Sequence, residues 1–171
     1  MELPGSPYLY ALATVSITFV GFSALLIVFR QSMGGELNQY DTYFTLSFLQ
    51  IGFIVTAGAL LPPALALYGW PADVVWRVAG TGISIPILWF VASVPARRRA
   101  ATGRPTPLFI RTLLSVQGLA AVALLFSAAG ILRQPGVAIY ASAMTTILFA
   151  SGIAYLLALS VILGELAKRT S

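Results

Sequence analysis

Residues 137–163 read VAIYASAMTTILFASGIAYLLALSVIL, without one charged side chain. An α-helix rises about 1.5 Å per residue, so about 20 apolar residues cross the hydrocarbon core of a bilayer, which is about 30 Å thick. This stretch is therefore long enough to span a membrane. Four more apolar runs precede it, at residues 7–29, 42–68, 74–94 and 108–131. Together the five runs predict an all-α bundle of five transmembrane helices that forms a single domain over residues 1–171.

The amino-acid composition points the same way. Hydrophobic residues make up 58% of the chain and charged residues only 9%, whereas about 25% of the residues in a typical soluble domain are charged. Ten basic and five acidic side chains are too few to cover the surface of a soluble fold of this length. We therefore expect the lipid bilayer to surround most of the protein surface.

The third run is the weakest of the five. Residues 74–94 include Gly80, Gly82 and Pro86, which interrupt the apolar pattern. Two interpretations remain open: the run crosses the membrane, giving five spans, or it is re-entrant, giving four. We favour five spans because the run is long enough to cross, and because Arg77 lies near one end, from which its side chain can reach the interface.

Basic residues are distributed unevenly between the two sides of this bundle. With five spans and the N-terminus outside, eight of the ten basic residues lie on the cytoplasmic side, and only Arg77 and Arg133 lie outside. Because cytoplasmic loops concentrate Lys and Arg, we expect the N-terminus outside and the C-terminus in the cytoplasm. In the re-entrant alternative Arg30 and Arg77 exchange sides, and the C-terminus is again cytoplasmic. Nine of the ten basic residues are arginine, which favours a bacterial inner membrane.

The residues that are missing exclude most catalytic chemistry. The chain has no cysteine and no histidine, which removes thiol nucleophiles, the usual catalytic triad, and most zinc and haem sites. The acidic residues all lie in loops or at the ends of runs, namely Glu2, Glu36, Asp41, Asp73 and Glu165. We therefore expect no enzyme activity, no catalytic residues, no metal and no cofactor. The basic residues form no face with interleaved aromatics, so we expect no nucleic-acid binding.

Hydroxyl and amide side chains inside the apolar runs are the remaining polar candidates. Thr14, Thr18 and Gly21 share one helical face of the first run, and Gln50 and Gln117 lie at comparable depth. A buried amide in lipid needs a partner. These side chains therefore either join helices through hydrogen bonds or line a pore.

Small residues recur at every fourth position of the fifth run. The stripe consists of Ala138, Ser142, Thr146, Ala150, Ala154 and Ala158. Small side chains at this spacing let helix backbones approach closely. The stripe predicts a packing surface within one subunit or between subunits, and Ser142 and Thr146 are also pore-lining candidates.

Four arginines gather in the predicted loop 95–107, namely Arg97, Arg98, Arg99 and Arg104. Their simplest role is to hold this loop in the cytoplasm. The alternative is that they contact anionic lipid headgroups.

Two functions are compatible with these features. The first is a homo-oligomeric pore or channel, which needs only a lined path and no catalytic group. The second is an accessory or assembly subunit that packs against a larger membrane-protein partner. We favour the pore, because five helices with hydroxyl-bearing faces can surround an axis by self-association.

Overall fold

A computed structural model of the chain describes residues 3–32, 39–132 and 136–170. The described residues form five α-helices and no strand, which confirms the predicted all-α class. The helices are α1 (Ser6–Ser32), α2 (Gln39–Ala66), α3 (Ala72–Thr102), α4 (Leu108–Ala128) and α5 (Gly136–Thr170).

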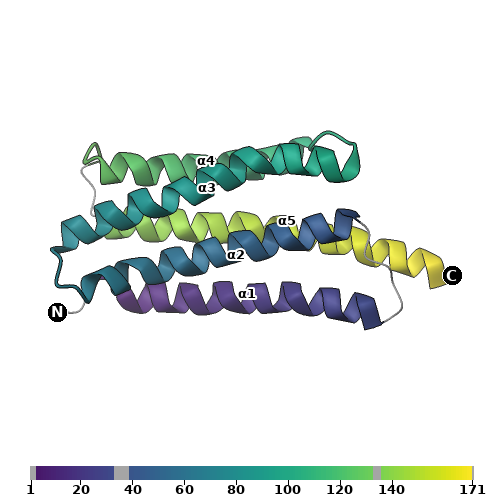
Figure 1. The fold of residues 1–171 in the computed structure, drawn as a ribbon, viewed down its shortest axis with the longest axis horizontal. Coiled ribbons are helices and arrows are strands. Elements are labelled where there is room, and N and C mark those ends of the chain that lie inside the picture. Colours follow the sequence, from purple (N-terminus) through teal and green to yellow (C-terminus); the bar gives the residue numbers. More distant parts are fainter. Residues whose placement is uncertain (1–2, 33–38, 133–135, 171) are drawn as a thin grey trace.

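The five helices lie side by side along one long axis (Figure 1). Helices that follow one another in sequence pack together, as expected for short connections: α1 packs on α2, α2 on α3, α3 on α4 and α4 on α5. Helix α5 also contacts α1, α2 and α3. The N- and C-termini lie at opposite ends of the bundle, and α1 and α4 lie at opposite edges (Figure 1).

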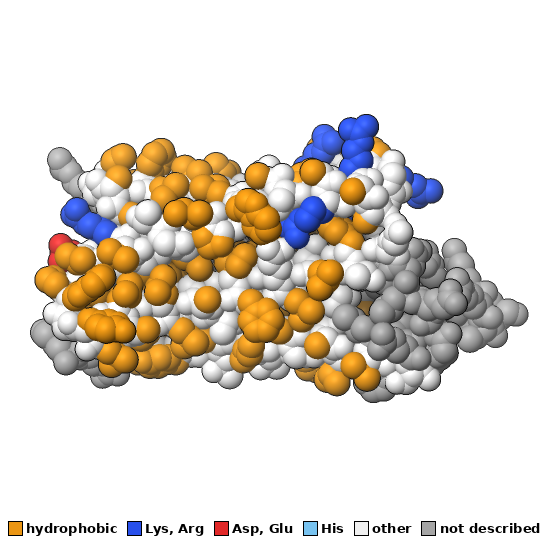
Figure 2. Space-filling model, viewed as in Figure 1, with side chains coloured by type: hydrophobic (Ala, Val, Ile, Leu, Met, Phe, Trp, Pro, Cys, Tyr) orange, Lys and Arg blue, Asp and Glu red, His pale blue; other side chains and the backbone are white. Residues whose placement is uncertain are grey.

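Each helix contains a segment that is long and apolar enough to cross a membrane. Large apolar side chains are exposed on the outer surface, among them Phe22, Phe53, Leu119 and Phe149. Figure 2 shows such side chains spread along the flank, while most of the visible basic side chains gather near one end. This arrangement supports an integral membrane protein. We call the end that carries Arg97, Arg98, Arg99 and Arg104 the arginine end.

Helix α3 continues beyond the predicted loop boundary. The sequence predicted a loop from residue 95, but the helix runs to Thr102 and includes Pro95, so Arg97, Arg98 and Arg99 are helical. Alanine and arginine are strong helix formers, which explains the continuation through residues 96–101. The helix ends at Gly103, whose φ is +66° and whose N–H donates to Arg99 O at 2.9 Å, because glycine adopts this left-handed conformation without strain.

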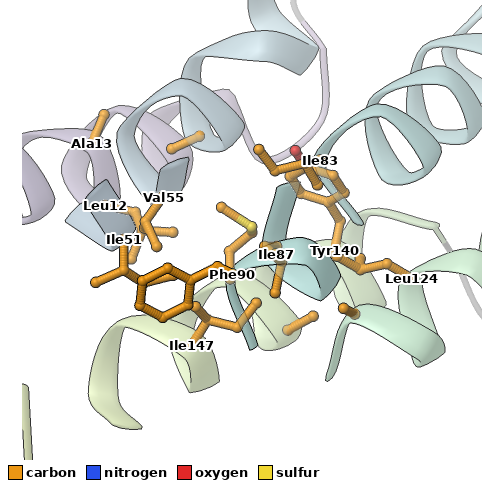
Figure 3. Packing of buried hydrophobic residues seen from close by; sticks show 14 of the residues in the cluster. Leu12, Ala13, Ile51, Val55, Ile83, Ile87, Phe90, Leu124, Tyr140 and Ile147 are labelled. Atoms are coloured by element: carbon orange, nitrogen blue, oxygen red, sulfur yellow. The ribbon is translucent and has the colours of Figure 1, made fainter. Parts of the chain in front are cut away.

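The centre of the bundle is filled by side chains from all five helices (Figure 3). The side chains of Val55, Ile87 and Ile147 are fully buried. Tyr140 is also buried, and its hydroxyl donates to Gly58 O at 2.6 Å.

Close backbone approaches hold neighbouring helices together. Ser16 donates to Gly52 O at 2.9 Å between α1 and α2, and a Cβ at Gly52 would clash with Val20. Ser84 donates to Ala121 O at 3.1 Å between α3 and α4. Hydroxyls on one helix thus bond to carbonyls of the next, as is common where small residues line helix contacts.

Candidate functional site

The side chain of Arg97 points into the bundle. Its Nη1 donates to Gln50 Oε1 at 2.7 Å, and its Cζ lies 5.5 Å from the ring centres of both Trp89 and Phe90. These rings lie about two turns earlier on α3. Side chains on a helix lean toward its N-terminus. For a residue near the C-terminal end of α3, this direction leads inward, away from the arginine end.

The guanidinium of Arg97 has more donors than acceptors around it. Arginine carries five N–H groups, and Gln50 accepts from one of them. Nε and Nη2 are buried and have no hydrogen-bond partner among the described residues. The ring faces of Trp89 and Phe90 attract the cation but carry no counter-charge. Asp73 is the one acidic residue whose side chain is described, and it lies in the first turn of α3, at the other end of the bundle.

An open groove of about 470 Å³ runs past Arg97 between the start of α2 and the end of α3. The other lining residues are Gln39, Thr42, Tyr43, Leu46, Ala100 and Ala101. We call it the Arg97 groove. It combines an apolar wall with polar side chains from the first turns of α2, and Arg97 supplies its positive charge.

A second, smaller cavity of about 70 Å³ lies behind Tyr43. Tyr43 lines both hollows, and its hydroxyl donates to Val94 O at 3.3 Å. The cavity wall is largely apolar, with aromatic rings from Phe44, Phe48 and Phe90. The other polar side chains on it are Ser47, Arg98, Gln117 and Ser151. We call it the Gln117 cavity.

The side chain of Gln117 is 4% exposed, and only part of its hydrogen-bonding capacity is used. Its Nε2 donates to Ser151 Oγ at 2.9 Å and lies 3.5 Å from Ile147 O. Ser151 itself donates to Ile147 O at 2.8 Å, so its oxygen is left to accept from Gln117. Oε1 of Gln117 is buried without a donor among the described residues. The cavity has room for a water molecule that would supply one.

The two amides singled out from the sequence belong to separate networks. Gln50 bonds to Arg97 between α2 and α3, whereas Gln117 bonds to Ser151 between α4 and α5. They do not bond to each other. Each amide bonds to a side chain on another helix.

The hydroxyl-bearing candidates lie on the outer surface. Thr14, Thr18, Ser142 and Thr146 are all exposed. The hydroxyls of Thr14, Thr18 and Thr146 each donate to the carbonyl four residues earlier in the same helix, at 2.8–2.9 Å. None of the four side chains points into the filled centre of the subunit.

The small-residue stripe of α5 divides into two halves. Ala150 is buried, and Ala154 and Ala158 are partly buried, so this half packs within the subunit. Ala138 is exposed and, with Ser142 and Thr146, lines an open groove of about 670 Å³ between α4 and α5. Gly21 on α1 is exposed, and no atom lies within 4 Å of a Cβ built on it.

The four clustered arginines take different positions. Arg99 and Arg104 are exposed. Arg98 is partly buried and lines the Gln117 cavity, and Arg97 points inward. The sequence did not single out Trp89, Phe90, Tyr43 or Ser151 as parts of a site, although the spacing of seven and eight residues from the two rings to Arg97 places them two turns apart on one helix.

Comparison with known proteins adds no assignment: no family model matches the chain, and neither a curated protein nor a solved structure matches it significantly.

Proposed function

We propose that the protein forms a homo-oligomeric membrane pore whose path runs between subunits. One observation carries the proposal: the four hydroxyl-bearing candidates Thr14, Thr18, Ser142 and Thr146 lie on the outside of the bundle, whereas buried apolar side chains fill its centre. A pore needs a lined, hydrated path. The outer faces of α1 and α5 offer exposed hydroxyls, and we propose that these faces of neighbouring copies line the path.

The groove between α4 and α5 supports self-association. Its wall includes Ala120, Ala123 and Ala138, and small side chains let a further helix approach closely. The occupant we propose is α1 of a second copy, whose outer face carries Thr14, Thr18 and Gly21. Since α1 and α4 lie at opposite edges of the bundle (Figure 1), this contact is head-to-tail. A head-to-tail contact repeated around an axis forms a ring when the rotation between copies closes, and a closed ring is the assembly we propose.

A second candidate is the accessory subunit. The hydroxyls of Thr14, Thr18 and Thr146 are already bonded to carbonyls of their own helices. Such faces pack against an apolar partner without leaving an unsatisfied donor. The same outer faces therefore also suit a different membrane protein as the occupant.

Cysteine cross-linking tests the ring directly, because the natural chain contains no cysteine. Variants combine Thr14→Cys on α1 with Thr146→Cys on α5, which lie at similar depth because Phe19 of α1 packs against Tyr155 of α5. With a short thiol-reactive cross-linker in membranes, the ring predicts a ladder of oligomers. The matched control combines Thr14→Cys with Ile85→Cys, an exposed position on α3, and is expected to give none.

Ion flux into liposomes distinguishes the two candidates. The pore predicts flux by the wild type and reduced flux by Thr146→Leu, because a larger apolar side chain narrows and dewets the path. A monomer in mild detergent, without a cross-linked ladder in membranes and without flux, would contradict the pore and leave the accessory subunit.

A further inference from the structure

Arg97 does not have the geometry of a topology signal. An arginine that only holds a helix end at the membrane surface extends its head into water, as Arg99 does two residues later on α3. The guanidinium of Arg97 instead bonds to Gln50 and lies against two aromatic rings. A guanidinium held between two helices with unpaired N–H groups needs a further hydrogen-bond partner.

The unpaired donors of Arg97 suit an anion that accepts several hydrogen bonds. A buried charge is costly unless it is paired and hydrogen-bonded. The described residues supply one acceptor, Gln50 Oε1, and leave Nε and Nη2 without any. A guanidinium forms its strongest hydrogen bonds with carboxylates and phosphates, because both oxyanions match its planar fork.

Arg97 lines the Arg97 groove, so an anion there lies next to its side chain, and the guanidinium has to turn toward the groove for the buried Nε and Nη2 to donate to it. The groove is open to the outside, and its wall beyond Arg97 includes Leu46, Ala100 and Ala101, which suit apolar carbon next to a charged group. Its other wall comes from the first turns of α2, where the helix dipole favours negative charge. Arg99 and Arg104 are exposed at the same end of the bundle and raise the local concentration of anions.

The depth of the groove favours phosphate. The groove lies at the ends of two helices that are long enough to cross a membrane, which is the depth of lipid headgroups. We infer that the Arg97 groove binds a phosphate group, supplied by the headgroup of an anionic phospholipid or by a soluble phosphate compound. This inference is independent of the proposed pore, because it involves neither the outer face of α1 nor the groove between α4 and α5.

Thermal unfolding with added ligands tests the inference and distinguishes the two sources. The protein in a zwitterionic detergent receives phosphatidylglycerol, phosphatidylcholine, or sodium phosphate at matched ionic strength. We expect phosphatidylglycerol near saturation to raise Tm by about 5 °C more than phosphatidylcholine does. If sodium phosphate alone produces the rise, the source is a soluble phosphate. If neither phosphatidylglycerol nor sodium phosphate raises Tm above the value with phosphatidylcholine, the inference is overturned.

Two matched variants show whether Arg97 is responsible. Arg97→Gln and Arg99→Gln remove the same charge from the same helix, but only Arg97 lines the groove. The rise in Tm should disappear in Arg97→Gln and persist in Arg99→Gln. If the ligand-induced rise in Tm were lost equally in both variants, it would come from general surface charge and the inference would be wrong. An unchanged rise in Arg97→Gln would also overturn the inference.

A second readout covers the case in which Arg97→Gln does not fold. The phosphorus content of the wild type, purified in phosphate-free detergent with phosphatidylglycerol present and then washed, should approach one bound phosphate per subunit. Arg97→Lys keeps the charge but loses the fork, so it should retain less phosphate while Arg99→Gln retains the wild-type amount. If a carboxylate of the chain such as Asp41 were the partner instead, phosphate would bind only to the Asp41→Asn variant, and the inference would be wrong.

Discussion

Arg97 on α3 donates a hydrogen bond of 2.7 Å to Gln50 on α2, residues that are 47 positions apart in the sequence. The bond fixes a cation at the contact between two helices, with the rings of Trp89 and Phe90 beside it. The energetic role of Gln50 is therefore tied to that of Arg97. Losing the amide deprives a partly buried guanidinium of its one hydrogen-bond acceptor among the described residues.

We therefore predict strong energetic coupling between Arg97 and Gln50. In a double-mutant cycle of Gln50→Leu and Arg97→Met, the double variant should lose about 1 kcal/mol less unfolding free energy than the sum of the single variants, because the second substitution removes a partner that the first has already isolated. The measurement is the free energy of unfolding in detergent micelles. Additive losses would show that the two side chains do not stabilise each other.

Substitutions of Gln50 and Gln117 should change the free energy of unfolding independently of each other. Gln50 bonds to Arg97 and Gln117 to Ser151, and the two networks share no residue. The losses of unfolding free energy caused by Gln50→Leu and Gln117→Leu should therefore be additive to within about 0.5 kcal/mol in the same assay. A clearly larger interaction free energy would mean that the amides meet in the membrane.

The bond between Gln117 and Ser151 gives an asymmetric prediction. Ser151→Ala leaves the buried amide nitrogen of Gln117 with only the long contact to Ile147 O, whereas Gln117→Leu removes the polar group altogether. Because an unsatisfied buried donor costs more than an apolar replacement, Ser151→Ala should destabilise by about 1 kcal/mol and Gln117→Leu by less. Thr146→Ala, on the exposed side of the same helix, is the control and should have almost no effect. Greater destabilisation by Gln117→Leu would show that the cavity holds a complete hydrogen-bond network.

The number of helices could be predicted because each helix that crosses a membrane shows in the sequence as one long apolar run. Every apolar run of sufficient length had to become a helix, since lipid offers no partner for backbone groups. The end of α3 was predicted wrongly, because Arg97, Arg98 and Arg99 are polar enough to suggest a loop although arginine is a good helix former.

The candidate site was much less predictable than the helices. The sequence identified Gln50, Gln117 and the arginines as polar residues but gave no means of pairing them. Which of three consecutive arginines points inward depends on the rotation of α3 and on its register against α2. Both are set by contacts between residues far apart in the chain, such as the bond of Tyr43 to Val94 O.

The membrane orientation stays a prediction from charge. The arginine end should face the cytoplasm and the N-terminus should lie outside, because Lys and Arg accumulate on the cytoplasmic side. Reporter fusions after Ser6 and after Gly103 test this. Activity of a cytoplasm-specific reporter at the first site, or of an export-specific reporter at the second, would contradict the orientation.

Two glycines provide a matched test of how tightly the bundle is packed. A Cβ at Gly58 would clash with Met144 and would lie 2.7 Å from Cγ1 of Ile83, whereas a Cβ at Gly21 would meet nothing within 4 Å. Gly58 also accepts the hydrogen bond of Tyr140, so a shift of its backbone disturbs that contact as well. Gly58→Ala should therefore destabilise the monomer by about 1–3 kcal/mol through overpacking.

Gly21→Ala should leave unfolding of the monomer unchanged to within about 0.5 kcal/mol or stabilise it slightly, because alanine has the higher helix propensity. The measurement is thermal unfolding of both variants in the same detergent. If Gly58→Ala were neutral, Met144 and Ile83 would have to move aside without cost, and the centre of the bundle would be looser than its buried side chains indicate. If Gly21→Ala lowered the stability of an oligomer but not of the monomer, the exposed face of α1 would be a contact between copies, as the proposed ring requires.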